Sequence, residues 1–443
     1  MANYLVSEIF KTIGTPSVTY VKRNEGKFEF ELTNNLSIPG TLCLLTGPSK
    51  TGKTTLYKKV ISEFKKTPLT IRCNDKMTIE DVWRNALEDV NFDRITNQAE
   101  TGQIELSSQV KTGISSGWEW LGKIIGEISL GLKGKYSSET VKDRVLSRPS
   151  PKHLIPILKE LPFILVVEDF HYLNEDTKKS VFQQWKDFTD SEVSTIIVGT
   201  AHHAVDLALS NKDLVGRISH IEVGTWEIED LKKIIMQGLN ELKVNISEPH
   251  CQFIASESVG LPLITQAISS RLFLDKEITT YNTKNKLKFT KSDVESAMTN
   301  VANQNFNVFK DIYQILITGF RKGARKYNTY ELLLLIFTLD PVAFKLVRIE
   351  IDSRLDKLNS KFAKPPVASV NSTLGSIGKL QKKNGIELLE WSNKQGCLYI
   401  LEPSFLYYLR WKDVISGITQ KADLLTKIYD IINKDFPVKV ADK

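Results

Sequence analysis

One short motif constrains this chain more than any other feature of its sequence. Residues 47–54 read GPSKTGKT and satisfy the pattern G-x-x-x-x-G-K-T. An apolar run at residues 42–45 precedes the motif, and residues 56–61 after it have helical spacing. A strand, a Gly-rich loop and a helix in this order are the context in which the pattern holds a polyphosphate. We therefore expect a nucleoside triphosphate site here rather than a chance Gly-rich turn.

The parts of this loop, called the P-loop below, have separate predicted roles. Consecutive backbone N–H groups and the positive N-terminal end of the following helix bind phosphate. Lys53 is placed to reach the β- and γ-phosphates, and the Thr54 hydroxyl is placed to ligate Mg²⁺. The predicted nucleotide-binding residues of the loop are Gly47, Pro48, Ser49, Lys50, Thr51, Gly52, Lys53, Thr54 and Thr55.

A second signal lies at residues 163–169, where five apolar residues are followed by Glu168 and Asp169. This pattern is typical of a buried parallel strand whose C-terminal end carries carboxylates. Ligands of open α/β sheets bind at that edge of the sheet. We expect Glu168 and Asp169 to serve Mg²⁺ and the attacking water, and the sequence does not say which residue has which role.

The remaining strand signals predict an α/β fold with a parallel sheet of about five strands and helices between them. They lie at residues 68–73, 194–200 and 218–223. Thr200 is the polar tip of the second of these runs. A polar side chain at that position can contact the γ-phosphate or the attacking water, so Thr200 is a candidate catalytic residue.

The last third of the chain has a different pattern. Helical spacing at residues 330–337, 349–358 and 367–383 is followed by a hairpin signal at residues 386–401. Three helices followed by a hairpin is the order of a winged helix-turn-helix. Residues 226–300 are helical before it. The predicted domains are a lead-in over the nucleotide (1–40), a P-loop NTPase domain (41–225) with an insertion (99–150), a helical lid (226–300), a winged helix (301–412) and a helical tail (413–443).

Charge is distributed unevenly between these parts. Residues 301–443 contain 22 Lys and Arg against 14 Asp and Glu, whereas residues 1–300 contain 37 against 38. The third predicted helix of the winged helix carries Lys379, Lys382 and Lys383. Duplex DNA is therefore an expected partner. Many winged helices contact only protein, so a protein partner is the alternative.

The cysteine content and the hydropathy of the chain indicate its cellular compartment. The four cysteines are far apart and match no metal-ligand spacing, as expected in a reducing compartment. The first residues show no secretory signal, and no uncharged run of about 18 residues could cross a bilayer. We expect a cytoplasmic protein without stable membrane insertion. The insertion, which is interrupted by several glycines, has two interpretations. It could be an amphipathic segment that contacts a partner or a membrane, or a surface excursion from the nucleotide-binding fold. The second interpretation is favoured because the segment lacks the basic polar face of an interfacial helix.

Taken together, the motifs resemble those of the STAND ATPases and their AAA+ relatives, including the origin-recognition type. Residues 20–23 are similar to the F-V-G-R box, with Lys22 where Gly is usual, and the P-loop has Lys50 in a usual Gly position. Residues 168–171 resemble the D-D-x-H motif, with Glu168 in place of the first Asp. Residues 260–262 match the G-x-P signature of a nucleotide-sensing helical subdomain.

The resemblance implies ATP as the nucleotide, with Tyr20 and Arg23 near the adenine and Pro262 coupling the helical subdomain to it. It also implies a homo-oligomer or larger complex and a regulatory role, often in prokaryotic defence or transcription. The leading hypothesis is an ATPase of low turnover that acts as a switch, in which nucleotide sets the position of the basic winged helix. The competing hypothesis is a scaffold that binds ATP without hydrolysis.

Arg217 falls just before the fifth strand, where AAA+ proteins place an arginine finger. A guanidinium is always charged and can fork onto a γ-phosphate. We therefore expect Arg217 to act across a subunit boundary. The alternative is a surface arginine paired with Asp213 or Glu222.

Overall fold

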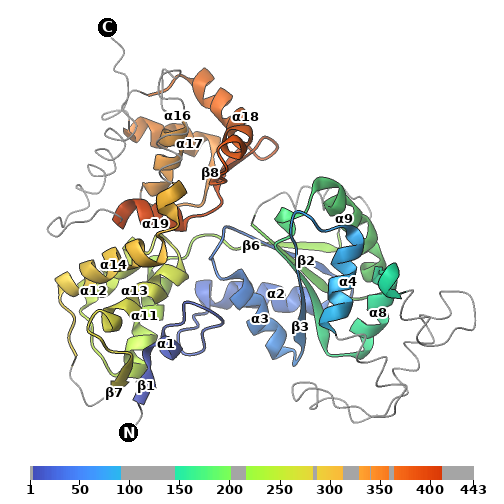
Figure 1. Cartoon of the computed structure of the whole chain (residues 1–443), viewed down its shortest axis with the longest axis horizontal. Coiled ribbons are helices and arrows are strands. Elements are labelled where there is room, and N and C mark those ends of the chain that lie inside the picture. Colours follow the sequence, from blue (N-terminus) through green and yellow to red (C-terminus); the bar gives the residue numbers. More distant parts are fainter. Residues whose placement is uncertain are drawn as a thin grey trace, which may run out of the picture. The chain divides into compact units, whose positions relative to one another are not determined.

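The computed structural model describes residues 3–90, 145–200, 216–282, 287–312, 329–339, 341–358 and 364–411. The chain divides into two compact units, drawn in Figure 1. The sheet unit comprises Gly26–Gly47 and Lys53–Glu222, and the helical unit comprises Met1–Glu25, Pro48–Gly52 and Val223–Lys443. Most of the predicted insertion, the predicted C-terminal tail and Asp213 lie outside the described residues.

The sheet unit is built on five parallel strands, which confirms the predicted sheet. Their order is β3-β4-β5-β2-β6. The strands are β2 (Leu42–Thr46), β3 (Thr67–Arg72), β4 (Phe163–Glu168), β5 (Thr195–Gly199) and β6 (Ile218–Glu222). The P-loop strand β2 and its neighbour β5 are buried along their whole length, as their unbroken apolar sequences predict.

Helices cover both faces of this sheet (Figure 1). Helices α2 (Lys27–Ser37) and α3 (Lys53–Glu63) lie on one face. Helices α4 (Ile79–Asp89), α8 (Pro151–Glu160) and α9 (Glu175–Asp190) lie on the other, and a one-turn helix, η2 (Phe170–Tyr172), follows β4. A buried aromatic group of Trp83, Trp185 and Phe188 joins α4 to α9, with ring centroids 5.5 to 6.0 Å apart.

The first part of the helical unit contains α11 (Ile228–Leu242), α12 (Glu248–Glu257), α13 (Pro262–Leu274) and α14 (Lys291–Asn305). The beginning of the chain joins this group: β1 (Asn3–Leu5) pairs antiparallel with β7 (Thr280–Asn282), and α1 (Val6–Ile9) follows β1. A short helical segment, η1 (Arg23–Gly26), ends the N-terminal stretch. None of the helices among the described residues is long and apolar enough to span a membrane.

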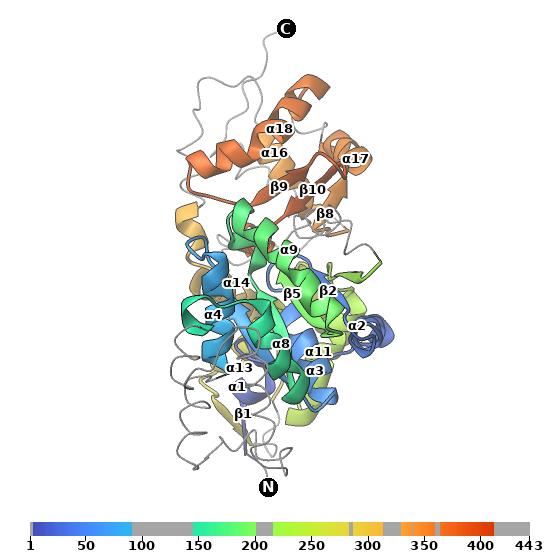
Figure 2. The same ribbon diagram turned by 90° about the vertical axis from the view of Figure 1, so that its right-hand side faces the viewer.

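The second part of the helical unit combines helices with a three-stranded antiparallel sheet of order β8-β10-β9, and Figure 2 shows this sheet beside α16, α17 and α18. Its elements are α16 (Thr329–Leu335), η4 (Ile336–Thr338), β8 (Lys345–Val347), α17 (Arg348–Leu358), α18 (Val367–Lys383), β9 (Leu389–Ser392), β10 (Cys397–Ile400) and α19 (Ser404–Trp411). The sequence predicted the helices α16, α17 and α18 and the hairpin but not the short strand β8. Buried Gln381 fixes α18 to the hairpin, because its Oε1 accepts the N–H groups of Leu388 and Leu389.

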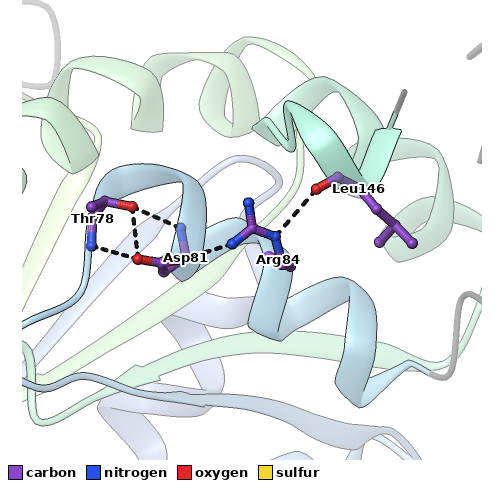
Figure 3. A network of polar contacts seen from close by, with 4 residues as sticks. All are labelled: Thr78, Asp81, Arg84 and Leu146. Carbon is purple, nitrogen blue, oxygen red and sulfur yellow. Dashed lines mark hydrogen bonds and ion pairs between the residues drawn. The ribbon is translucent and has the colours of Figure 1, made fainter. Parts of the chain in front are cut away.

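The start of α4 is held by the polar network in Figure 3. The Asp81 N–H donates to the Thr78 hydroxyl at 3.3 Å, and the Thr78 N–H donates to the Asp81 carboxylate at 2.9 Å. Arg84 extends the network, because it donates to Asp81 at 2.7 Å and to the Leu146 carbonyl at 3.2 Å. The pKa of Asp81 lies below its ordinary value, chiefly because the Thr78 backbone N–H donates to the carboxylate. The Thr78 hydroxyl and Arg84 act in the same direction.

This network predicts a pH-dependent contribution to stability. Thr78→Ala removes the cap and is expected to lower the free energy of unfolding by about 1 kcal/mol. Asp81→Asn is expected to destabilise at neutral pH. The loss should disappear as the pH falls through the depressed pKa of Asp81, because the wild-type carboxylate then becomes neutral as well. Urea unfolding at several pH values measures both effects.

The matched control is Glu80→Gln, which removes the same charge from the same helical turn. It tests the interaction with the helix dipole alone, without the capping hydrogen bonds. An Asp81→Asn loss equal to that of Glu80→Gln at every pH would contradict the prediction.

Candidate nucleotide-binding site

The P-loop connects β2 to α3, and its backbone has three residues with positive φ. Gly47 (φ 144°) and Gly52 (φ 95°) adopt conformations that suit glycine. Lys50 (φ 65°) is in the left-handed region although it carries a side chain. Inside the loop, the Thr51 hydroxyl donates to the Pro48 carbonyl at 2.9 Å. The loop backbone is therefore defined at both glycines, and Lys50 is its strained position.

The two ends of the loop belong to the sheet unit. Lys53 is buried, and its Nζ donates to the Gly47 carbonyl at 2.8 Å. Thr54 Oγ1 donates to Glu168 Oε1 at 2.8 Å. The structure therefore brings together the predicted phosphate-binding lysine, the predicted metal-binding hydroxyl and the predicted acid of β4.

Glu168 ends β4 and is buried, with further partners that the sequence analysis did not identify. Tyr57 donates its hydroxyl to Glu168 Oε1 at 3.0 Å. Arg72, the register partner of Glu168 on β3, places Nε 3.5 Å from Oε2. A signal for Tyr57 existed, because it lies three residues after Thr54 and so on the same face of α3.

Asp169 follows Glu168 in the left-handed conformation, with φ 58°. Its side chain reaches the surface but is partly surrounded by protein. This partial burial, followed by the negative charge of Glu168, raises the pKa of Asp169, while Lys53 and Arg72 act in the opposite direction. The two adjacent carboxylates thus have different surroundings, since one is buried and hydrogen-bonded and the other is accessible.

The paired oxygens of Thr54 and Glu168 fit Mg²⁺, which prefers oxygen ligands. Mg²⁺ usually keeps several waters and is held by one or two protein oxygens together with substrate phosphates. Among the described residues there is no group of three or more His, Cys, Asp or Glu that could hold a metal ion. The residues present therefore suit a metal that arrives with a nucleotide.

Thr200 and Arg217 lie at opposite edges of the sheet. Thr200 directly follows β5, which lies between β4 and β2, so it is at the carboxyl edge with the P-loop and Glu168. Arg217 precedes β6 at the amino edge, where it donates to Asp190 at 2.6 Å. The structure does not bring Arg217 to the P-loop of its own sheet unit, and its action across a subunit boundary stays a prediction.

Residues 48–52 group with the helical unit, where they meet Trp226. Trp226 Nε1 donates to the Thr51 carbonyl at 2.9 Å, and the Trp226 N–H donates to the Gly260 carbonyl at 3.1 Å. Gly260 has φ 72°, and a Cβ there would lie 3.0 Å from Thr225 Cγ2, so the position requires glycine. Gly260 stands two residues before Pro262, the first residue of α13.

Arg23 contacts the same tryptophan. Its guanidinium lies 5.1 Å from the centre of the Trp226 ring and donates to the carbonyls of Gly224 and Thr225. Tyr20 is partly buried in the same N-terminal segment. Trp226 therefore connects the predicted Arg23, the G-x-P segment and the P-loop, although the sequence analysis gave it no role.

The loop also contacts the C-terminal part of the helical unit. The Ser49 N–H donates to the Leu401 carbonyl at 3.3 Å. Lys50 Nζ lies 3.1 Å from Glu402 Oε1 and 3.2 Å from Ser404 Oγ. The same ammonium is 5.7 Å from the ring centres of both Phe306 and Phe309. Lys50, which stands where glycine is usual, thus contacts residues at the start of α19.

Comparisons with known proteins agree with this geometry. Residues 39–207 match the family model described as the AAA domain. The sheet unit has the AAA+ P-loop NTPase fold. Across the chain, the structure is similar to the Walker-type ATPase PABY2304 of Pyrococcus abyssi, with a TM-score of 0.52, 14% identity and coverage of 91% of this chain and 99% of that one.

Two further proteins show similarity to this chain. The structure of Cdc6p from Pyrobaculum aerophilum gives a TM-score of 0.41 at 14% identity, over 96% of this chain and 98% of that one. The RuvB subunit of the Holliday junction branch migration complex from Mycoplasmopsis synoviae (strain 53) is 23% identical over 124 residues. That match covers 25% of this chain and 39% of the RuvB length.

Proposed function

We propose that this chain binds ATP with Mg²⁺ and hydrolyses it. The observation that carries the proposal is the hydrogen bond of 2.8 Å between Thr54 and Glu168, which sets a metal-ligating hydroxyl beside a buried carboxylate at the P-loop. Bound Mg²⁺ would neutralise charge on the β- and γ-phosphate oxygens. We assign Lys53, whose Nζ donates to the Gly47 carbonyl in the same unit, to bind the phosphates.

The surroundings of the two carboxylates support separate roles. Glu168 shares its Oε1 with the Thr54 hydroxyl, so we assign it to the metal side. Asp169 extends from the strand end with an accessible carboxylate, so we assign it to orient or deprotonate the attacking water. Thr200, at the end of the adjacent strand, is assigned to contact the γ-phosphate or that water.

The contacts of Lys50 support coupling between nucleotide and the C-terminal part of the helical unit, as the switch hypothesis requires. Glu402 places a negative charge at the tip of the P-loop, where a triphosphate brings more negative charge. Both Lys50 and Glu402 are partly exposed, so their ion pair contributes about 1 kcal/mol at most and can be broken. We propose that ATP binding weakens this docking contact and that docking in turn weakens ATP binding.

The C-terminal elements also support DNA binding as a second function. Helix α18 contains no Asp or Glu, and its exposed residues include Lys379, Lys382 and Lys383. A Cβ added to Gly375 or Gly378 on the same helix would meet no atom within 4 Å, so the helix is smooth and open there. Helix α18 follows α16 and α17 and precedes the hairpin of β9 and β10. A basic helix in this position suits the major groove of DNA.

The ATPase proposal predicts two separable losses. Lys53→Ala is expected to abolish ATP binding, because it removes the buried cation of the loop. Asp169→Ala is expected to bind ATP at near wild-type affinity but to lose turnover, because only the attacking water is affected. Calorimetric binding and phosphate release, each with and without DNA, measure the two effects. If wild-type protein binds ATP but releases no phosphate under any of these conditions, the ATPase proposal fails and the scaffold hypothesis is retained.

The coupling proposal predicts a gain of affinity. Glu402 Oε1 accepts the N–H of Ser404, the first residue of α19, at 3.3 Å. Glu402→Gln keeps an oxygen for this bond but removes the charge held by Lys50. ATP binding is therefore expected to tighten about fivefold, which corresponds to ~1 kcal/mol. Hydrogen exchange within residues 397–411 is expected to become faster when ATP is added to the wild type.

The control for this experiment is Glu387→Gln, which removes the same charge from an exposed position just before β9. Equal ATP affinities of the wild type, Glu402→Gln and Glu387→Gln would show that Lys50 and Glu402 do not couple the loop to the C-terminal elements.

The DNA proposal predicts a change of salt dependence. Alanine at Lys379, Lys382 and Lys383 is expected to reduce the slope of log affinity against log salt by about 0.9 for each DNA phosphate that the variant no longer neutralises. The control removes the same charge from the exposed lysines Lys288, Lys291 and Lys310. Salt-independent binding, or none at low salt, would assign the helix to a protein partner.

A further inference from the structure

Glu168, the acid at the end of β4, has a longer and more flexible side chain than the aspartate that is usual at this position. A glutamate has one more rotatable bond than an aspartate, so its carboxylate loses more conformational freedom when it is held in one place. Glu168 is nevertheless held, because two hydroxyl groups donate to its Oε1. Thr54, one of the two donors, belongs to the P-loop motif itself. The second donor, Tyr57, belongs to no motif.

Tyr57 is buried, whereas the other partners of Glu168, Thr54 and Arg72, are exposed. Its side chain is fully buried under the sheet, and its hydroxyl is 3.0 Å from Glu168 Oε1. Thr70 on β3 is a polar neighbour of the same phenol group and acts to lower its pKa. Burial raises the pKa of Tyr57 well above its ordinary value, so the phenol keeps its proton and remains a donor. Arg72, by contrast, is 76% exposed and lies 3.5 Å from the carboxylate.

We propose that Tyr57 is a positioning residue that orients the Glu168 carboxylate for Mg²⁺-bound nucleotide and so allows a glutamate to take the place of an aspartate. The inference rests on the proposed function. The proposed role of Tyr57 is exerted through its hydrogen bond to Glu168. In metal sites, groups that hydrogen-bond to a ligating carboxylate typically change metal affinity by about 10- to 100-fold when they are removed.

The test is Tyr57→Phe, which keeps the buried ring and removes only the donor. Affinity for a non-hydrolysable ATP analogue is measured by calorimetry in EDTA and in Mg²⁺. The affinity in EDTA is expected to stay unchanged, and the additional affinity that Mg²⁺ provides is expected to fall about 10-fold. A merely structural role of Tyr57 would lower the affinity in both conditions alike, and that result would overturn the proposal.

Two controls separate orientation from folding. Tyr330→Phe removes another buried tyrosine hydroxyl, one that donates to Gln381 in the helical unit, and should leave the effect of Mg²⁺ intact. Thr70→Val leaves Tyr57 in place but removes a polar neighbour of its phenol group. It should cause a smaller loss in the same direction, and it replaces Tyr57→Phe if that variant does not fold.

A double-mutant cycle with Glu168→Asp tests the compensation directly. The shorter carboxylate does not extend to the Tyr57 hydroxyl, so Tyr57→Phe should cost much less in the Glu168→Asp background than in the wild type. Additive effects would overturn the proposal. If wild-type protein gains no affinity from Mg²⁺, the proposed function fails. If the wild type gains affinity and Tyr57→Phe retains all of it, only this inference fails.

Discussion

The hydrogen bond between Thr54 and Glu168 depends on the parallel sheet. The two residues are 114 positions apart, and they meet because β2 and β4 run in the same direction and end at one edge. One strand, β5, lies between them and carries Thr200 at its own end. A slip of one residue in β4 would turn Glu168 to the opposite face of the sheet. The buried apolar side chains of β4 and its neighbours fix the register, and the register in turn fixes the chemistry.

The sequence predicted those parts of the site that combine a motif with an apolar run. The P-loop and the acids of β4 were found because each follows a run that is buried in the sheet. Tyr57 and Trp226 were missed because an aromatic residue in a helix or loop has the same sequence pattern whether it fills a core or bonds a functional group. Arg72 ends a strand like many surface arginines, and its role depends on its register partner. The three-residue strand β8 was missed because it is too short for a periodic pattern.

Lys50 shows how a departure from a motif can be stabilised by contacts elsewhere. A non-glycine residue in the left-handed region costs roughly 1 kcal/mol or more. Its ammonium is bonded to Glu402 and Ser404 and lies beside two phenylalanine rings, which together offset that cost. These contacts exist only while the start of α19 is docked on the loop. The conformation of the loop at Lys50 is therefore stabilised by the same contacts that hold the C-terminal elements there.

The size of these contacts limits how far nucleotide could move the C-terminal elements. A shift from 1:99 to 99:1 requires about 5.5 kcal/mol of differential binding, whereas one partly exposed ion pair supplies about 1 kcal/mol. The Ser49 to Leu401 hydrogen bond adds a similar amount. Release that depended on these two contacts alone, about 2 kcal/mol together, would change the ratio of docked to released forms about 30-fold. A complete switch also has to separate Lys50 from Phe306 and Phe309, whose rings pack against α19 through Phe405 and Tyr407. The contacts of the Lys50 ammonium with these two rings therefore add to the free energy that the proposed switch would require from ATP.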